Sequence, residues 1–158
     1  MSKPQFVYVS YIKTTPEKLW EALTEGEFTR QYWFGYRIES DWMAGSALKF
    51  YAPDGTLAHL DRVLRVEKPK ILSYTWTPIP TEELRGEAPS TVTFELEPQG
   101  QVVKLTVTHF NFPDGSKVFP QICNGWPAVL SSLKTWLESG TALTIGAFSN
   151  GKTCQEAK

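Results

Sequence analysis

One stretch near the end of the chain constrains the fold more than any other, because its apolar residues recur with helical spacing. The apolar positions are Trp126, Val129, Leu130, Leu133, Trp136 and Leu137, with Ser131, Ser132, Lys134 and Glu138 expected on the opposite side. Gly140 is well placed to cap the C-terminus of such a helix. The pattern predicts a long amphipathic helix, whose apolar face another layer of the fold must cover.

A shorter helix is predicted near the start of the chain. Thr15 can cap the first free amides, and Pro16 suits the first helical position because proline has no N–H to satisfy. The expected helix covers Pro16–Thr24, and a second short helix follows over Glu27–Tyr32. Trp20 and Trp136 are interpreted as structural anchors of the helices.

The remaining regular segments alternate polar and apolar residues and read as β-strands. The expected strands are Gln5–Lys13, Ser46–Tyr51, Thr56–Glu67, Ile71–Thr77, Thr91–Glu97 and Gln101–Phe110. Turn residues 53–55 and 98–100 join neighbouring strands as hairpins, whereas Thr77 to Ser90 is expected to be a long exposed loop. The order of elements predicts an α+β fold of about six or seven antiparallel strands, curved around the long C-terminal helix.

Strand alternation also predicts which side chains face the interior. In one strand Leu72, Tyr74 and Trp76 share a face. In the clearest hairpin, the inward positions are Val92, Phe94 and Leu96 on one strand and Val103, Leu105, Val107 and His109 on the other. His109 is therefore expected to point into the interior.

Length and charge narrow the classes of function. A chain of 158 residues is expected to form one domain, here 1–140, with a mobile tail at 141–158. Sixteen basic against 17 acidic residues give a net charge of −1, which disfavours nucleic acid and an anionic membrane surface as partners. Two unpatterned cysteines and the lack of a signal-peptide core favour a cytoplasmic protein, expected as a monomer or weak dimer.

The motifs together resemble a known family. They are residues 15–24 (TPEKLWEALT), 72–76 (LSYTW), 92–96 (VTFEL), 105–109 (LTVTH) and the helix from Gly125-Trp126 to Leu137-Glu138. This order is similar to that of the START-like, birch-pollen-allergen-like superfamily (SRPBCC), and within it to bacterial relatives of the C-terminal domain of the activator of the heat shock protein 90 ATPase. The resemblance implies a helix-grip fold with an internal cavity for an apolar or aromatic small molecule, and it implies no cofactor.

Large aromatic side chains are the candidate lining of that cavity, because they offer apolar surface with a few polar atoms. The candidate ligand-binding residues are Trp33, Trp42, Phe50, Tyr74, Trp76, His109 and Trp126, with Tyr36 and Phe110 as further aromatic candidates. The alternative interpretation of each residue is plain core packing.

The two histidines receive different interpretations. His109 is expected either to contact a ligand or move a proton, or to be a core histidine with satisfied nitrogens. His59 lies two residues from Asp61, but two ligands on one face are too few for a catalytic metal. We therefore expect no metal site, and interpret His59 as part of a solvated strand face.

Three functions remain open at this point. The first is binding of a small hydrophobic or aromatic ligand in an internal cavity, without assigned chemistry. The second is a protein-interaction module related to the co-chaperone domain, with a chaperone as partner. The third is a cyclase- or hydratase-type enzyme that uses His109 as acid–base.

Overall fold

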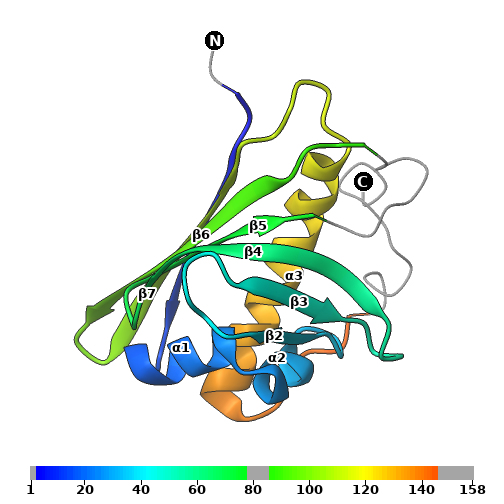
Figure 1. Cartoon of the computed structure of the whole chain (residues 1–158). Helices are drawn as coiled ribbons and strands as arrows, with labels where there is room; N and C mark the ends of the chain where they lie inside the picture. Colours follow the sequence, from blue (N-terminus) through cyan, green and yellow to red (C-terminus); the bar gives the residue numbers. More distant parts are fainter. Residues whose placement is uncertain (1–2, 78–85, 146–158) are drawn as a thin grey trace.

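The computed structural model describes residues 3–77 and 86–145 and contains seven strands and three helices there (Figure 1). The strands are β1 (Phe6–Ile12), β2 (Arg37–Ser40), β3 (Ala47–Tyr51), β4 (Leu57–Glu67), β5 (Ile71–Trp76), β6 (Ser90–Gln99) and β7 (Val102–Phe110). The helices are α1 (Pro16–Thr24), α2 (Gly26–Tyr32) and α3 (Val118–Ser139). The predicted α+β class and the order of elements are confirmed.

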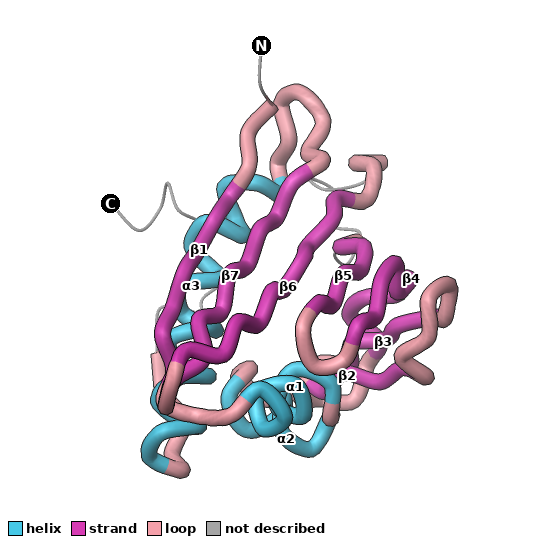
Figure 2. Tube along the Cα trace, turned by 90° about the vertical axis from the view of Figure 1, so that its left-hand side faces the viewer, coloured by secondary structure: helices cyan, strands magenta, loops and turns pink. Residues whose placement is uncertain are grey.

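All seven strands form one antiparallel sheet with the order β1-β7-β6-β5-β4-β3-β2. The long helix α3 runs along one face of this sheet, while α1 and α2 lie together at one end of it (Figures 1 and 2). This arrangement is the helix-grip fold, in which a curved sheet and one long helix enclose the core between them.

The predicted inward face of the β6–β7 hairpin is confirmed residue by residue. Val92 pairs with His109, and Phe94 pairs with Val107. The side chains of all these pairs are buried, and His109 has no exposed surface. The interior therefore places a histidine among apolar side chains, which requires that protein groups satisfy its ring nitrogens.

The helix α3 begins eight residues before the predicted apolar stripe, at Val118. Its N-terminus is capped from a distant loop, because the Glu87 carboxylate accepts hydrogen bonds from the N–H of Lys117 at 2.8 Å and of Val118 at 3.3 Å. The Ser116 hydroxyl donates to the same carboxylate at 2.5 Å and accepts from the N–H of Phe119 at 3.0 Å. These hydrogen-bond acceptors and the negative charge of Glu87 stabilise the N-terminus of α3. The sequence pattern did not indicate this N-terminus, because Pro120 and Pro127 interrupt the first half of the helix.

One detail of the predicted helix is corrected, and one is supported. Ser132 was expected on the exposed side but is fully buried, because its hydroxyl accepts a hydrogen bond from the N–H of Leu143 in the segment after the helix. The rings of Phe28 and Tyr32 of α2 both pack at a tilt against that of Trp136 of α3, at 5.4 and 5.8 Å between ring centroids. Trp136 thus ties α2 to α3, as its interpretation as an anchor requires.

The strand β2 was missed, because its four residues include only one apolar side chain, Ile38. The predicted tail is described only over 141–145, which has no regular structure, and its remainder lies outside the described residues. Most of the predicted exposed loop, at 78–85, also lies outside them.

The edge strand β1 is held by α3. The Lys134 ammonium donates to the carbonyl oxygen of Tyr11 at 2.8 Å, and the Glu138 carboxylate accepts from the N–H of Lys13 at 2.8 Å. The N–H of Lys13 and the Lys134 ammonium lower the pKa of the Glu138 carboxyl. These contacts occupy backbone groups at the end of an edge strand, where an unpaired group could otherwise pair with another chain.

Candidate functional site

The seven predicted ligand-binding residues lie together in one continuous set of ring contacts, which we call the aromatic cluster. They are Trp33 after α2, Trp42 between β2 and β3, Phe50 on β3, Tyr74 and Trp76 on β5, His109 on β7 and Trp126 on α3. Successive rings lie 5.2 to 6.5 Å apart between centroids. The structure therefore brings together residues that are up to 93 positions apart in the sequence, although their role as ligand contacts stays a prediction.

Trp76 is at the centre of the cluster. Its ring contacts those of Trp33, Phe50, His59, His109 and Trp126. Five members of the cluster are buried, whereas Trp76 and Trp42 are half-buried. Trp76 and Trp42 are therefore the two members of the cluster that solvent reaches.

The two additional aromatic candidates, Tyr36 and Phe110, lie in different environments. Tyr36 is half-buried and packs against the core. Phe110 follows His109 directly on β7, so it points to the opposite face of the sheet, and it is not part of the core cluster. Phe110 is therefore withdrawn as a candidate.

Trp42 is held in an unusual backbone conformation. Its φ is 57°, a left-handed value that a bulky L residue rarely adopts. Two hydrogen bonds fix it, one from its ring Nε1–H to the carbonyl of Thr24 at 3.0 Å and one from its backbone N–H to the hydroxyl of Ser40 at 3.0 Å. Strained residues of this kind concentrate at functional sites, so the backbone conformation of Trp42 marks its surroundings as a candidate site.

Both ring nitrogens of His109 are engaged by other side chains. The indole N–H of Trp126 donates to Nδ1 at 2.9 Å, so Nδ1 carries no proton. The proton must then lie on Nε2, which donates to the Ser90 hydroxyl at 2.7 Å. Burial, and secondly the nearby His59, lowers the pKa of His109 to about 3. His109 is thus a neutral core histidine at physiological pH.

This hydrogen-bonded arrangement favours the interpretation of His109 as a core histidine with satisfied nitrogens over an acid–base role. A general base needs a free nitrogen that can accept a proton, but Nε2 already carries one and Nδ1 already accepts one. For the same reason the short contact with Ser90 is not a nucleophile–base pair, because Nε2 cannot take the proton of the Ser90 hydroxyl. His109 orients Trp126 within the cluster.

The interpretation of His59 as part of a solvated strand face was wrong. Its side chain is only 12% exposed, and its ring lies 4.6 Å from that of Trp76 and 5.4 Å from that of Phe50 between centroids. Two residues along β4, the side chain of Asp61 has no exposed surface. The inward face of β4 therefore carries a histidine and an aspartate beside the aromatic cluster.

Polar partners of the site were harder to find from the sequence. Ser90, the partner of His109, was expected at the end of a loop and not in a strand. Thr75, whose hydroxyl donates to Asp61 Oδ1 at 2.9 Å, was expected on the strand face opposite to Trp76. The available signal was that His59 and Asp61 share a strand face, but the adjacent charges of Asp61 and Arg62 favoured a solvated face.

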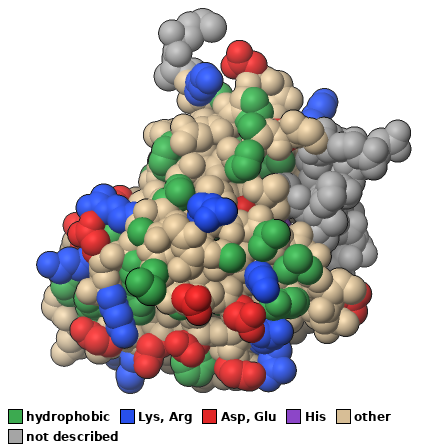
Figure 3. Space-filling model, in the orientation of Figure 1, with side chains coloured by type: hydrophobic (Ala, Val, Ile, Leu, Met, Phe, Trp, Pro, Cys, Tyr) green, Lys and Arg blue, Asp and Glu red, His purple; other side chains and the backbone are tan. Residues whose placement is uncertain are grey.

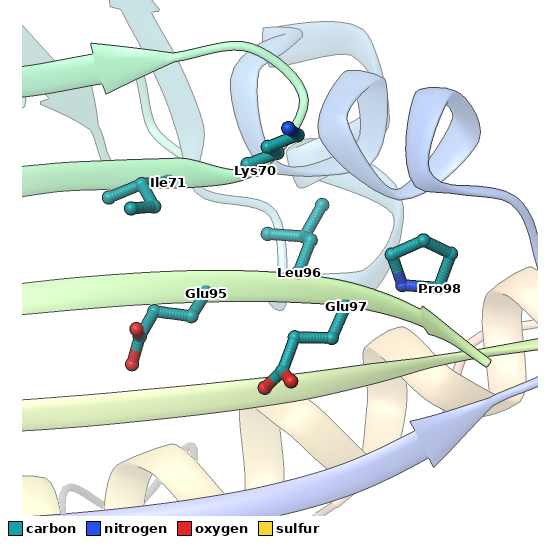
Figure 4. Close-up of a pocket in the computed structure, with 6 residues that line it drawn as sticks. All are labelled: Lys70, Ile71, Glu95, Leu96, Glu97 and Pro98. Atoms are coloured by element: carbon teal, nitrogen blue, oxygen red, sulfur yellow. The ribbon is translucent and has the colours of Figure 1, made fainter.

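A separate surface depression of about 290 Å³ lies at the start of β5 and the end of β6 (Figure 4). Its lining residues are Lys70, Ile71, Glu95, Leu96, Glu97 and Pro98. Figure 4 shows both glutamate side chains extending along the sheet. None of these residues belongs to the aromatic cluster. The face of the molecule shown in Figure 3 carries acidic and basic side chains interspersed with apolar ones.

Comparison with known proteins places this fold in a family. The family model described as "Activator of Hsp90 ATPase homolog 1-like protein" matches residues 13–138. The chain belongs to this family. The match begins one residue after the end of β1 and spans α1, α2, the six strands β2 to β7 and nearly all of α3. It confirms the resemblance to the Hsp90-activator-like branch of the START-like proteins. No curated protein matches the chain.

Solved structures share this fold. Protein MLL2253 from Mesorhizobium loti is 28% identical and has a TM-score of 0.73, with 89% of this chain and 100% of that one covered. The Aha1 dimer from Colwellia psychrerythraea is 23% identical, with a TM-score of 0.70 and coverage of 87% and 98%. PFC0360w, an HSP90 activator from Plasmodium falciparum, is 23% identical, with a TM-score of 0.70 and coverage of 85% and 96%.

The described residues offer neither a metal site nor a membrane-spanning helix. Within residues 3–77 and 86–145, no three His, Cys, Asp or Glu side chains are grouped so as to hold a metal ion. In the same part of the chain, no helix is both long and apolar enough to cross a membrane.

Proposed function

We propose that the protein binds a small hydrophobic or aromatic molecule against the aromatic cluster. The observation that carries the proposal is the continuity of the cluster, from buried Phe50 and Trp126 to half-buried Trp76 and Trp42. Rings in this arrangement offer flat apolar surface that a ligand ring can contact by offset or edge-to-face packing. Family membership supports the proposal, because the resemblance to START-like proteins implies a cavity for an apolar or aromatic small molecule between sheet and helix.

A neutral fluorescent probe tests this function. We expect N-phenyl-1-naphthylamine to bind with one saturable site and to accept excitation energy from tryptophan. Replacing Trp76 by leucine removes the ring that contacts five others, so we expect this variant to bind the probe about tenfold more weakly. Fluorescence titration measures both constants.

The matched control is Trp136→Leu, which removes an equally large ring between α2 and α3. Its affinity for the probe should stay within about twofold of the wild-type value. Equal weakening by the two substitutions, or no saturable binding to the folded wild-type protein, would count against the proposal.

A second candidate function is binding to an Hsp90-type chaperone. It is favoured by the description of the family and by the similarity to an HSP90 activator from Plasmodium falciparum. The outward face of β4 offers apolar contacts for such a partner, because Leu60 is 56% exposed and Leu64 is 44% exposed.

A chaperone ATPase assay tests this second function. If the proposal holds, the wild-type protein raises the ATPase rate of a purified Hsp90, and the double variant Leu60→Ser/Leu64→Ser loses at least half of that increase. These positions are solvent-exposed, so the variant should keep its fold. An ATPase rate that the wild-type protein leaves unchanged would remove the candidate.

A further inference from the structure

The strand β4 pairs with β3 over its first half and with β5 over its second half. A buried polar pair, His59 and Asp61, lies near this change of partner and beside the aromatic cluster. Residues of β4 up to Arg62 pair with β3, whereas Val63 and the residues after it pair with β5. At this change of partner the Thr75 hydroxyl on β5 accepts from the N–H of Arg62 at 3.0 Å and donates to Asp61 Oδ1. The other oxygen of Asp61 is left facing His59.

Two atoms of this pair lack hydrogen-bond partners although they are buried. They are His59 Nδ1 and Asp61 Oδ2, which lie 3.6 Å apart. This separation is too long for a hydrogen bond between them. Leaving buried polar atoms unpaired is costly, and such atoms in a native protein call for a specific explanation.

We infer that His59 and Asp61 form the polar anchor of the proposed ligand site, and that they select a hydroxylated aromatic molecule over a purely apolar one. The inference rests on the proposed ligand-binding function and adds the chemical class of the ligand. One oxygen atom can lie about 2.8 Å from both Nδ1 and Oδ2, because these two atoms are themselves 3.6 Å apart. A single hydroxyl group therefore satisfies both.

The chemistry of the two atoms fits a hydroxyl group better than other small groups. A carboxylate oxygen only accepts hydrogen bonds, so the group opposite Asp61 must donate. The same group can accept from a protonated Nδ1 of His59. A hydroxyl does both with one oxygen atom, whereas an ether or ketone cannot donate and a second carboxylate would place like charges together.

The surroundings of the pair indicate that the hydroxyl belongs to an aromatic ring. The rings of Trp76 and Phe50 flank that of His59, and both belong to the aromatic cluster. A phenol or naphthol can therefore direct its hydroxyl group at the pair while its ring contacts these two side chains. The 12% exposure of the His59 side chain marks the end of the site that solvent reaches.

The test compares two ligands of nearly equal shape, 2-naphthol and 2-methylnaphthalene, by titration of the intact protein. Because a hydrogen bond to a charged group strengthens binding, we expect the wild-type protein to bind 2-naphthol roughly ten to a hundred times more tightly. Asp61→Asn and His59→Phe should each reduce this preference to a few-fold. Asp114→Asn, at an exposed position between β7 and α3, is the control and should leave the preference unchanged.

The outcomes separate the two proposals. If the wild-type protein binds both compounds equally, the anchor is overturned and the pair holds only water, while ligand binding stands. If neither compound binds, the proposed function fails together with the anchor. The wild-type comparison alone decides between these results, so it holds even if a variant does not fold. A preference that persists in both Asp61→Asn and His59→Phe would also overturn the anchor.

Discussion

Replacing Trp126 by alanine should lower the free energy of unfolding by about 3 to 5 kcal/mol, the range for large-to-small aromatic substitutions in a core. Trp126 is 3% exposed, and its ring contacts those of Trp33, Trp76, Phe94 and His109. The substitution also removes the N–H that satisfies His109 Nδ1 and leaves a buried acceptor unpaired. Urea unfolding followed by circular dichroism measures the change.

Two controls identify the cause of this loss. Trp126→Phe keeps most of the ring but not the N–H, so its stability should lie between those of the wild-type protein and the alanine variant. Trp136→Ala removes a tryptophan of the same helix that is only half-buried, and should cost less. A loss below about 1 kcal/mol for Trp126→Ala would contradict the described packing.

Acidification should destabilise the protein through His109. The pKa of His109 is lowered to about 3 in the folded state by burial, whereas an unfolded histidine titrates near 6.5. Between these values the unfolded chain binds a proton that the folded chain does not, so stability falls as the pH falls from about 6.5 towards 3. The contribution lost at pH 5 is about 2 kcal/mol, at 1.36 kcal/mol for each pKa unit.

Urea unfolding at pH 7, 6 and 5 measures this dependence on the wild-type protein and on His109→Gln. The glutamine side chain has a donor and an acceptor but does not titrate, so this variant should lose the slope of about 2 kcal/mol between pH 7 and 5. The variant will be less stable than the wild-type protein at pH 7 if the fit to Ser90 or Trp126 is poorer. Equal slopes in the two proteins would show that His109 is not the responsible group.

Local sequence patterns were sufficient to predict most of the fold. The Thr15 cap and Pro16 set the start of α1, and the hairpin turn fixed the register of β6 and β7. The start of α3 was not predictable in this way, because it depends on Glu87, which lies 31 residues before Val118. The strand β2 was missed because its pairing with β3 supplies the stabilisation that its own residues do not signal.

The sequence supplied the seven aromatic candidates, whose role as ligand contacts stays a prediction, but not the polar groups around them. Strand alternation predicted the inward face of Tyr74, Trp76 and His109. Helical periodicity placed Trp126 on the apolar face of α3, whereas Trp33, Trp42 and Phe50 were candidates only as large aromatic residues. The partners of His109 could not be predicted, because Ser90 and Trp126 reach it from β6 and α3. The burial of His59 and Asp61 depends on the change of partner along β4, which no local pattern shows.

The central claim is that a small aromatic molecule binds against the half-buried members of the aromatic cluster, Trp76 and Trp42, and the tryptophan indole N–H signals test it most directly. The chain has six tryptophans, each with one such signal in a ¹H–¹⁵N NMR spectrum. On titration with 2-naphthol, we predict saturable shifts for Trp76 and Trp42, with the signals of Trp20 and Trp136 unmoved. Unchanged spectra, or shifts that affect Trp20 and Trp136 as strongly as Trp76, would contradict the account.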